Sequence, residues 1–155
     1  MRDIIVLIMI FSIFIYGIFY NLKFRKTIKV FSSPSNLKKI ISLLSVIIFF
    51  AIAYIAGGKP WFYIFSSIAS IFFISTALTE GLSDEGIIFY TGGRGINNIK
   101  VLNFNNIRIL KIRKDEKITL KAQGQGDFVD MKFQLEDEEK IMEVLRNKEV
   151  RIVFD

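Results

Sequence analysis

Three long stretches without a charged residue limit what this chain can fold into. Residues 4–22, 40–58 and 60–79 contain no Asp, Glu, Lys or Arg, which gives uncharged windows of 19, 19 and 20 residues. As α-helices rising about 1.5 Å per residue, such windows reach across a hydrocarbon layer of about 30 Å. We therefore expect three transmembrane helices, followed by a polar second half.

The first window could also be a secretory signal peptide, because it begins near the N-terminus after Arg2. A retained helix is favoured because the window is long for a signal peptide and no small-residue cleavage pattern follows it. The basic residues 23–29 also resemble the flank of a stop-transfer segment. We expect residues 1–79 to form a three-helix anchor and residues 80–155 to form a separate domain.

The net charge of +6 is divided unevenly between the two halves. Residues 1–79 carry eight Lys/Arg and one Asp, a net +7, whereas residues 80–155 carry thirteen Lys/Arg and fourteen Asp/Glu, a net −1. Since the polar half has no basic excess, we expect no nucleic-acid partner. The sequence has no Cys and no His, which removes disulfides, thiolate metal ligands and the commonest acid–base group at neutral pH.

Positive charge also predicts the orientation of the chain in the membrane. The segment between the first two windows has six Lys/Arg residues and no acid, whereas Lys59 is the only charge between the second and third windows. Short basic loops remain on the cytoplasmic side. We expect a multi-pass cell-membrane protein with its N-terminus and the Gly57-Gly58-Lys59-Pro60 turn outside, and residues 23–39 and 80–155 in the cytoplasm.

The three windows lack the ionisable residues that mark transport or catalytic sites within membranes. They contain instead small and hydroxyl-bearing residues, which allow helices to approach closely. These residues are Ser66, Ser67, Ser70 and Ser75 in the third window and Ala53, Ala56 and Gly57 in the second. We interpret them as packing surfaces, within the chain or against a membrane protein partner or a second copy.

Residues 21–39 interleave cations with apolar residues. Such a segment could lie on the lipid bilayer, where each cation near anionic lipid headgroups contributes about 1 kcal/mol. The alternative is that the cations only set the orientation. Under the first hypothesis, the candidate lipid contacts are Lys23, Arg25, Lys26, Lys29, Lys38 and Lys39. Ser33, which precedes Pro34, is the predicted N-cap of the second helix.

Short runs of alternating apolar and polar residues are typical of the second half. They predict strands at residues 86–91, 97–104, 107–113, 117–123 and 128–135, with turn residues between them. In the last of these strands, the candidate core residues are Phe128, Met131 or Phe133, and Leu135. Residues 136–148 begin with acids, end with bases and place Ile141 and Leu145 on one apolar face, which predicts an amphipathic helix. A last short strand is expected at residues 150–154.

A glycine-rich segment at residues 90–98 lies between two of the predicted strands. Gly92, Gly93 and Gly95 suit a hairpin turn that needs positive φ angles. A phosphate site would place such glycines between a strand and a helix, and the known phosphate-binding spacings are absent. We therefore predict a turn, with Arg94 at its tip as a further candidate contact for an anionic headgroup.

The order of strands and one amphipathic helix, joined directly to membrane spans, resembles the bacterial PH-like (pleckstrin-homology-like) domains of small membrane proteins from low-GC Gram-positive bacteria. The resemblance rests on residues 83–89 (SDEGIIF), 99–112 (IKVLNFNNIRILKI) and 138–148 (EEKIMEVLRNK), with Phe104 where such proteins often have tryptophan. It implies three transmembrane helices followed by a cytoplasmic antiparallel sheet with one C-terminal helix. It also implies a scaffold for lipid or protein contact without catalytic residues.

The carboxylates of the chain offer no catalytic pair. Asp84 and Glu85 are adjacent and point apart if extended, and residues 136–139 lie where acids favour a helix N-terminus. We expect no enzyme, no cofactor and no metal site, but an interaction or regulatory module, or an accessory subunit of a membrane complex. The resemblance adds one alternative, a bacteriocin-immunity-type protein that protects against a membrane-active peptide.

Overall fold

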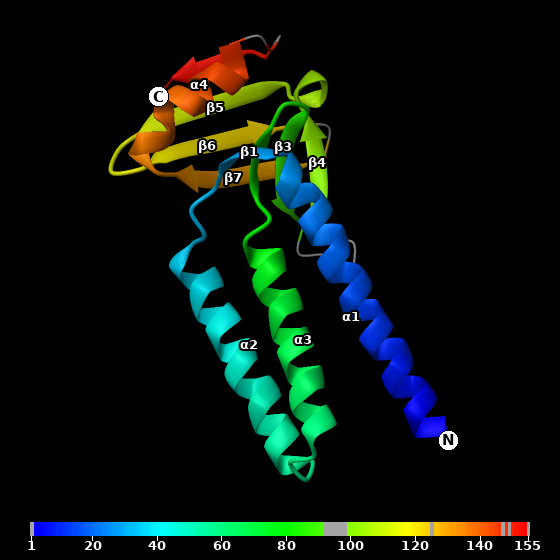
Figure 1. The fold of residues 1–155 in the computed structure, drawn as a ribbon. Helices are drawn as coiled ribbons and strands as arrows, with labels where there is room; N and C mark the ends of the chain where they lie inside the picture. Colours follow the sequence, from blue (N-terminus) through cyan, green and yellow to red (C-terminus); the bar gives the residue numbers. More distant parts are fainter. Residues whose placement is uncertain (1, 92–98, 125, 147, 149, 155) are drawn as a thin grey trace.

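The computed structural model of the chain describes residues 2–91, 99–124, 126–146, 148 and 150–154. In this part of the chain, three long helices extend from one end of a β-rich domain (Figure 1). The N-terminus and the turn between the second and third helices lie at the far end of the helices (Figure 1). The C-terminal helix lies on the opposite side of the molecule, at the top of the domain (Figure 1).

The three uncharged windows correspond to α1 (Arg2–Thr27), α2 (Asn36–Ile55) and α3 (Pro60–Ala77). Each contains a span that is long and apolar enough to cross a membrane, over Ile8–Thr27, Asn36–Ile55 and Pro60–Ala77. The end of α1 differs from the prediction, because the helix continues beyond Leu22 through the basic residues to Thr27. At about 1.5 Å per residue, this extension adds more than one turn that can lie outside a hydrocarbon layer.

Helix α3 contacts both α1 and α2. The small residues predicted for packing include Ala53, Ser66, Ser70 and Ser75, and the structure buries all four. The Ser66 hydroxyl donates to the Phe49 carbonyl oxygen across the α2–α3 contact at 2.8 Å. By contrast, Ala56 and Gly57 are exposed at the turn between the two helices. That turn needs glycine, because Gly57 and Gly58 have φ angles of 104° and 63°.

The β-rich domain contains two four-stranded sheets and one C-terminal helix. Sheet A has the order β1-β2-β3-β4, and sheet B has the order β7-β6-β5-β8. All neighbouring strands are antiparallel except β5 and β8, which are parallel. The strands are β1 (Ile28–Phe31), β2 (Gly81–Ser83), β3 (Gly86–Tyr90), β4 (Ile99–Asn103), β5 (Ile109–Lys114), β6 (Ile118–Gln123), β7 (Phe128–Phe133) and β8 (Ile152–Phe154). A short 3-10 turn, η1 (Phe104–Asn106), follows β4, and η2 (Leu135–Asp137) leads into α4 (Glu138–Arg146).

Strand β1 lies outside the region that the sequence assigned to the domain. It comes from the basic segment between the first two uncharged windows, and it pairs with β2 in the register Val30↔Leu82 and Phe31↔Gly81. Ile28 and Val30 are buried, so this segment is part of the sheet. The sheet therefore begins before the predicted division at residue 79, and the α2–α3 hairpin is inserted between two neighbouring strands.

The predicted N-cap of α2 is wrong by two residues. Ser35 is the cap, and its Oγ accepts a hydrogen bond from the Lys38 backbone N–H at 3.3 Å. Ser33 instead donates its own backbone N–H to the Lys132 carbonyl oxygen in β7 at 2.6 Å. Residue 33 is thus held by sheet B, and the helix begins after it.

The core of the domain lies between the two sheets and under α4. Ile141 and Leu145 of α4 are each 1% exposed, as the amphipathic pattern predicts. The predicted register of β7 is wrong in part: Val129, Met131 and Phe133 point into the core, whereas Phe128 is exposed. Leu135, the other predicted core residue of this segment, is also exposed, because the strand ends before it.

The last turns of α1 cover part of sheet A. Tyr20 and Phe24 pack on a cluster formed by Ile28, Ile88 and Ile99. Because α1 passes into β1 without a linker, helix and sheet share one apolar contact. The first apolar helix is therefore packed directly on the domain.

Candidate membrane-surface site

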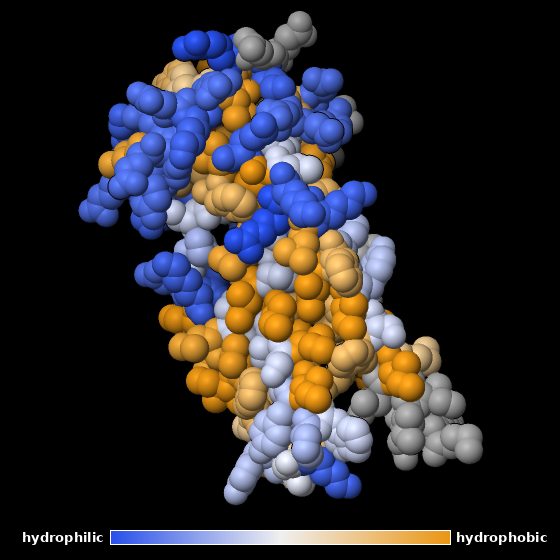
Figure 2. All heavy atoms as spheres, in the orientation of Figure 1, coloured by the Kyte–Doolittle hydropathy of each residue, from blue (hydrophilic) through white to orange (hydrophobic). Residues whose placement is uncertain are grey.

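The predicted lipid contacts lie mostly where the helices meet the domain. Lys23, Arg25 and Lys26 are in the last turns of α1, and Lys38 and Lys39 are in the first turn of α2. Figure 2 shows hydrophilic residues gathered beside the domain end of the otherwise apolar helices. Lys29 is in β1. Arg94 lies outside the described residues.

Of the cations with exposed side chains, three are lysines near the domain ends of α1 and α2: Lys23, Lys26 and Lys39. We call them the collar lysines. Among the described residues, no ion pair or hydrogen bond from their ammonium groups to another residue is found. Their charges are therefore available to an anionic partner at this level of the molecule.

Two of the predicted cations interact within the chain at exposed positions. The Arg25 guanidinium carbon lies 5.6 Å from the centre of the Phe31 ring, a cation–π contact between α1 and β1. Lys29 Nζ lies 3.4 Å from the Asp84 carboxylate, and both side chains are more than half exposed. Such exposed pairs contribute about 0–1 kcal/mol because water screens them, so neither cation is firmly held.

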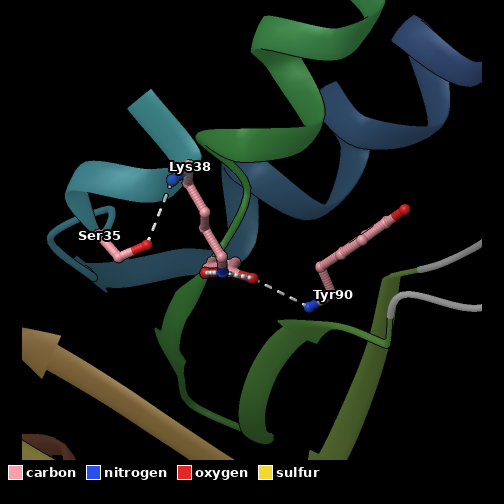
Figure 3. Close-up of polar contacts among 4 residues, drawn as sticks. Ser35, Lys38 and Tyr90 are labelled. Atoms are coloured by element: carbon pink, nitrogen blue, oxygen red, sulfur yellow. Dashed lines mark hydrogen bonds and ion pairs between the residues drawn. The ribbon is translucent and has the colours of Figure 1, made fainter. Parts of the chain in front are cut away.

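Lys38 differs from its neighbour Lys39 because a buried acid binds it. Its Nζ lies 2.6 Å and 2.5 Å from the two carboxylate oxygens of Glu80, and the Glu80 side chain is only 7% exposed (Figure 3). Oε1 of Glu80 also accepts the Tyr90 backbone N–H at 3.2 Å (Figure 3). The Lys38 charge is therefore compensated within the protein, and we do not count it among the collar lysines.

A polar hollow of about 470 Å³ lies on the domain between α4 and β1. Three lysines line it, but each has an acceptor: Lys29 has Asp84, Lys140 has the Asp137 carboxylate at 3.6 Å, and Lys148 has the Asp84 carbonyl oxygen at 2.7 Å. Lys148 also lies 5.6 Å from the Phe104 ring centre. Each ammonium group of the hollow thus has an acceptor within the chain.

Glu80 and Asn21 are the polar residues that the sequence analysis missed. The Asn21 amide, 1% exposed, donates to Ser75 Oγ and Thr76 Oγ1 at 2.9 Å each and so joins α1 to α3. One signal could have identified Glu80: it is the first acidic residue after Asp3, and it follows the last uncharged window, on the same predicted side of the membrane as the six cations of residues 23–39. Asn21 had no comparable signal, since a single amide at a helix end is common.

The flanks of the glycine-rich segment are compatible with the predicted hairpin. Strands β3 and β4 are antiparallel neighbours, with the pairs Gly86↔Asn103 and Tyr90↔Ile99 at the two ends. The predicted turn itself, with Gly92, Gly93, Arg94 and Gly95, lies outside the described residues. Tyr90 ends β3 beside Glu80, so this end of β3 faces the helices.

The fold and the collar define a class of protein: a two-sheet domain with one capping helix, mounted on apolar helices. A family model described as "Bacterial PH domain" matches residues 26–153. This match covers most of the 155 residues, and the chain belongs to the bacterial PH domain family. The matched range begins before β1 and includes the α2–α3 hairpin. No curated protein matches the chain.

Proposed function

We propose that this protein is a non-enzymatic interaction module whose PH-like domain is held at the inner surface of the cell membrane. The observation that carries the proposal is the connection of the domain to the helices at three points. The chain passes between helix and sheet at α1–β1, β1–α2 and α3–β2. If the three helices cross the bilayer as their length and composition permit, the domain has a fixed height and a fixed face toward the lipid.

The collar lysines supply the ligand chemistry of the proposal. They are at the domain end of α1 and α2, which is the level of the lipid headgroups for helices that span the hydrocarbon layer. A cation at this level attracts anionic headgroups by about 1 kcal/mol. We propose that Lys23, Lys26 and Lys39 bind anionic lipid, and that the remaining surface of the domain is available to a membrane or cytoplasmic protein partner.

Support for a role without catalysis comes from the sequence, which lacks His and Cys and so lacks the usual acid–base and thiol groups. The most conspicuous acid, Glu80, is occupied by Lys38 and Tyr90. An accessory role in a larger membrane complex is compatible with this arrangement. The immunity alternative rests on the family resemblance alone.

Lipid preference at the collar tests the proposal. The variant Leu22→Trp/Trp61→Phe places a single tryptophan beside Lys23, at a position that is 40% exposed in the native chain. In nanodiscs, a brominated anionic lipid should quench this tryptophan with an affinity about fivefold higher than that of a brominated neutral lipid, since about 1 kcal/mol per cation corresponds to that factor. High salt should reduce the preference, because exposed charges are screened over about 10 Å.

The triple change Lys23→Gln/Lys26→Gln/Lys39→Gln should abolish the lipid preference. The matched control is Lys140→Gln/Arg146→Gln/Arg151→Gln, which removes the same charge from α4 and the segment after it, far from the helices (Figure 1). The control should keep the preference. If the two brominated lipids quench the protein with native collar lysines equally, the lysines only set the orientation of the chain.

A further inference from the structure

Glu80 occupies a position where four parts of the protein meet. It lies between the end of α3 and the start of β2. Its carboxylate binds Lys38 of α2 and the Tyr90 backbone N–H at the end of β3 (Figure 3). Its carbonyl oxygen accepts the Ser32 backbone N–H, in the linker after β1, at 2.9 Å. One residue therefore joins the membrane hairpin to three strands of sheet A.

Because the Glu80 side chain is buried, water cannot readily replace these contacts. A carboxylate that is withdrawn from water is stable as a charge only when it is paired and hydrogen-bonded. Lys38 supplies the opposite charge and the Tyr90 backbone N–H supplies a fixed donor. Moving the carboxylate away would break both interactions, so this position of the Glu80 side chain is stable. The exposed Lys29–Asp84 pair lacks this property, because water can replace either partner.

The main chain leaves little freedom beside Glu80. A Cβ at Gly81 would lie 2.2 Å from the Val30 carbonyl oxygen, so β1 and β2 approach as closely as glycine allows. On the membrane side, Thr79 is fully buried, and its hydroxyl donates to the Ser75 carbonyl oxygen at 2.6 Å. Ser32 and Ser33 are held by their backbone hydrogen bonds to Glu80 and Lys132, so the remaining route for motion of α2 relative to the sheet is residues 34–35, and the Lys38–Glu80 pair spans them.

We infer that Lys38 and Glu80 form a latch that fixes the angle between the α2–α3 hairpin and the PH-like domain. The latch lies beside the end of β3, so a partner that displaced the hairpin would also release the Tyr90 contact. This inference goes beyond lipid binding and does not require it. Its test is therefore made in neutral lipid, where the collar lysines have no anionic partner.

The distance between the hairpin and the domain can be measured directly, because the chain has no cysteine of its own. Spin labels are attached at Ile55→Cys, 82% exposed at the end of α2, and at Glu139→Cys, exposed on α4. In phosphatidylcholine nanodiscs, the doubly labelled protein without further substitutions should give a single narrow distribution of distances between the two labels. Lys38→Met should broaden it and lower the melting temperature, since Glu80 is then buried without its counter-charge.

The double change Lys38→Met/Glu80→Gln separates the latch from stability. It removes the uncompensated charge, so the melting temperature should recover, while the distribution should stay broad because no ion pair holds the hairpin. Lys39→Met, the matched control one residue away, should keep both the narrow distribution and the melting temperature. The latch is refuted if Lys38→Met keeps the narrow distribution, if the double variant regains it, or if Lys39→Met broadens it equally.

Discussion

Replacing Leu145 by Asp should unfold the PH-like domain while the three apolar helices remain. Leu145 is 1% exposed on α4 and belongs to the core between the two sheets. An aspartate there would lose the apolar contacts of leucine and bury a charge without a partner, a combination that costs about 4 kcal/mol or more. Small domains have a free energy of unfolding of about 5–15 kcal/mol, so a loss of this size should unfold a large fraction of the molecules.

The measurement is trypsin digestion of the full chain in nanodiscs. The folded domain should protect the peptide bonds that follow its many Lys and Arg residues. Met142→Asp is the matched control, because Met142 is in the same helix but is 37% exposed. The control should resist trypsin like the native protein. Equal resistance of Leu145→Asp would mean that α4 does not dock on the sheets in solution.

Gly81→Val should detach β1 from the sheet. The added Cβ would lie 2.2 Å from the Val30 carbonyl oxygen and 2.7 Å from Ile28 Cγ2, and neither the β1 backbone nor the buried Ile28 can move away without opening the pair. The buried side chains of Ile28 and Val30 would then be exposed, at a cost of about 1.5–3 kcal/mol each. We expect the α2–α3 hairpin to lose one of its connections to the domain.

A single thiol reports this detachment. Val30→Cys introduces the only cysteine of the chain at a position that is 2% exposed, so a thiol reagent should label it slowly. Adding Gly81→Val should accelerate labelling strongly. Adding Gly126→Ala should leave labelling slow. Alanine is strained at the Gly126 φ of 92°, but its Cβ would meet no atom within 4 Å, so β1 is not displaced. Slow labelling with Gly81→Val would show that β1 is not held by the close approach at Gly81.

The elements with a strong local pattern were predictable from the sequence. Uncharged windows of about 20 residues indicated α1, α2 and α3, and period-two alternation indicated the β5–β6 hairpin. The acids and bases at opposite ends of α4, with Ile141 and Leu145 on one face, indicated a docked helix. In these cases the residues that determine the element lie within the element itself.

The features that escaped prediction depend on distant partners. Strand β1 has only four residues, one of them Lys29, and its partner β2 is separated from it by two helices. The Lys38–Glu80 pair joins residues 42 positions apart. The local sequence does not distinguish Lys38 from its neighbour Lys39, because only the fold brings Glu80 to Lys38. The length of α1 was also underestimated, because charged residues end a hydrophobic window without ending a helix.

The family and the fold agree on where the domain lies in the chain. The family match from residue 26 to residue 153 includes β1, the hairpin and most of β8, so it nearly coincides with residues 28–154, over which the two sheets extend in the structure. The hairpin is thus an insertion into the domain, and the domain is not appended after a finished anchor. This arrangement explains why six cations lie at or next to the junctions between helices and sheet, and why one of them, Lys38, meets a buried acid.

The side of the membrane on which the domain lies is the central point of the proposed function. Alkaline phosphatase, which is active only outside the cytoplasm, can be fused after residue 155 or inserted between Gly57 and Gly58, at the far end of the helices. The six cations on the domain side against Lys59 at the turn predict an inactive fusion at the C-terminus and an active insertion at the turn. The reverse pattern, with an active C-terminal fusion and a silent insertion, would place the domain and the collar lysines outside the cell and contradict the proposal.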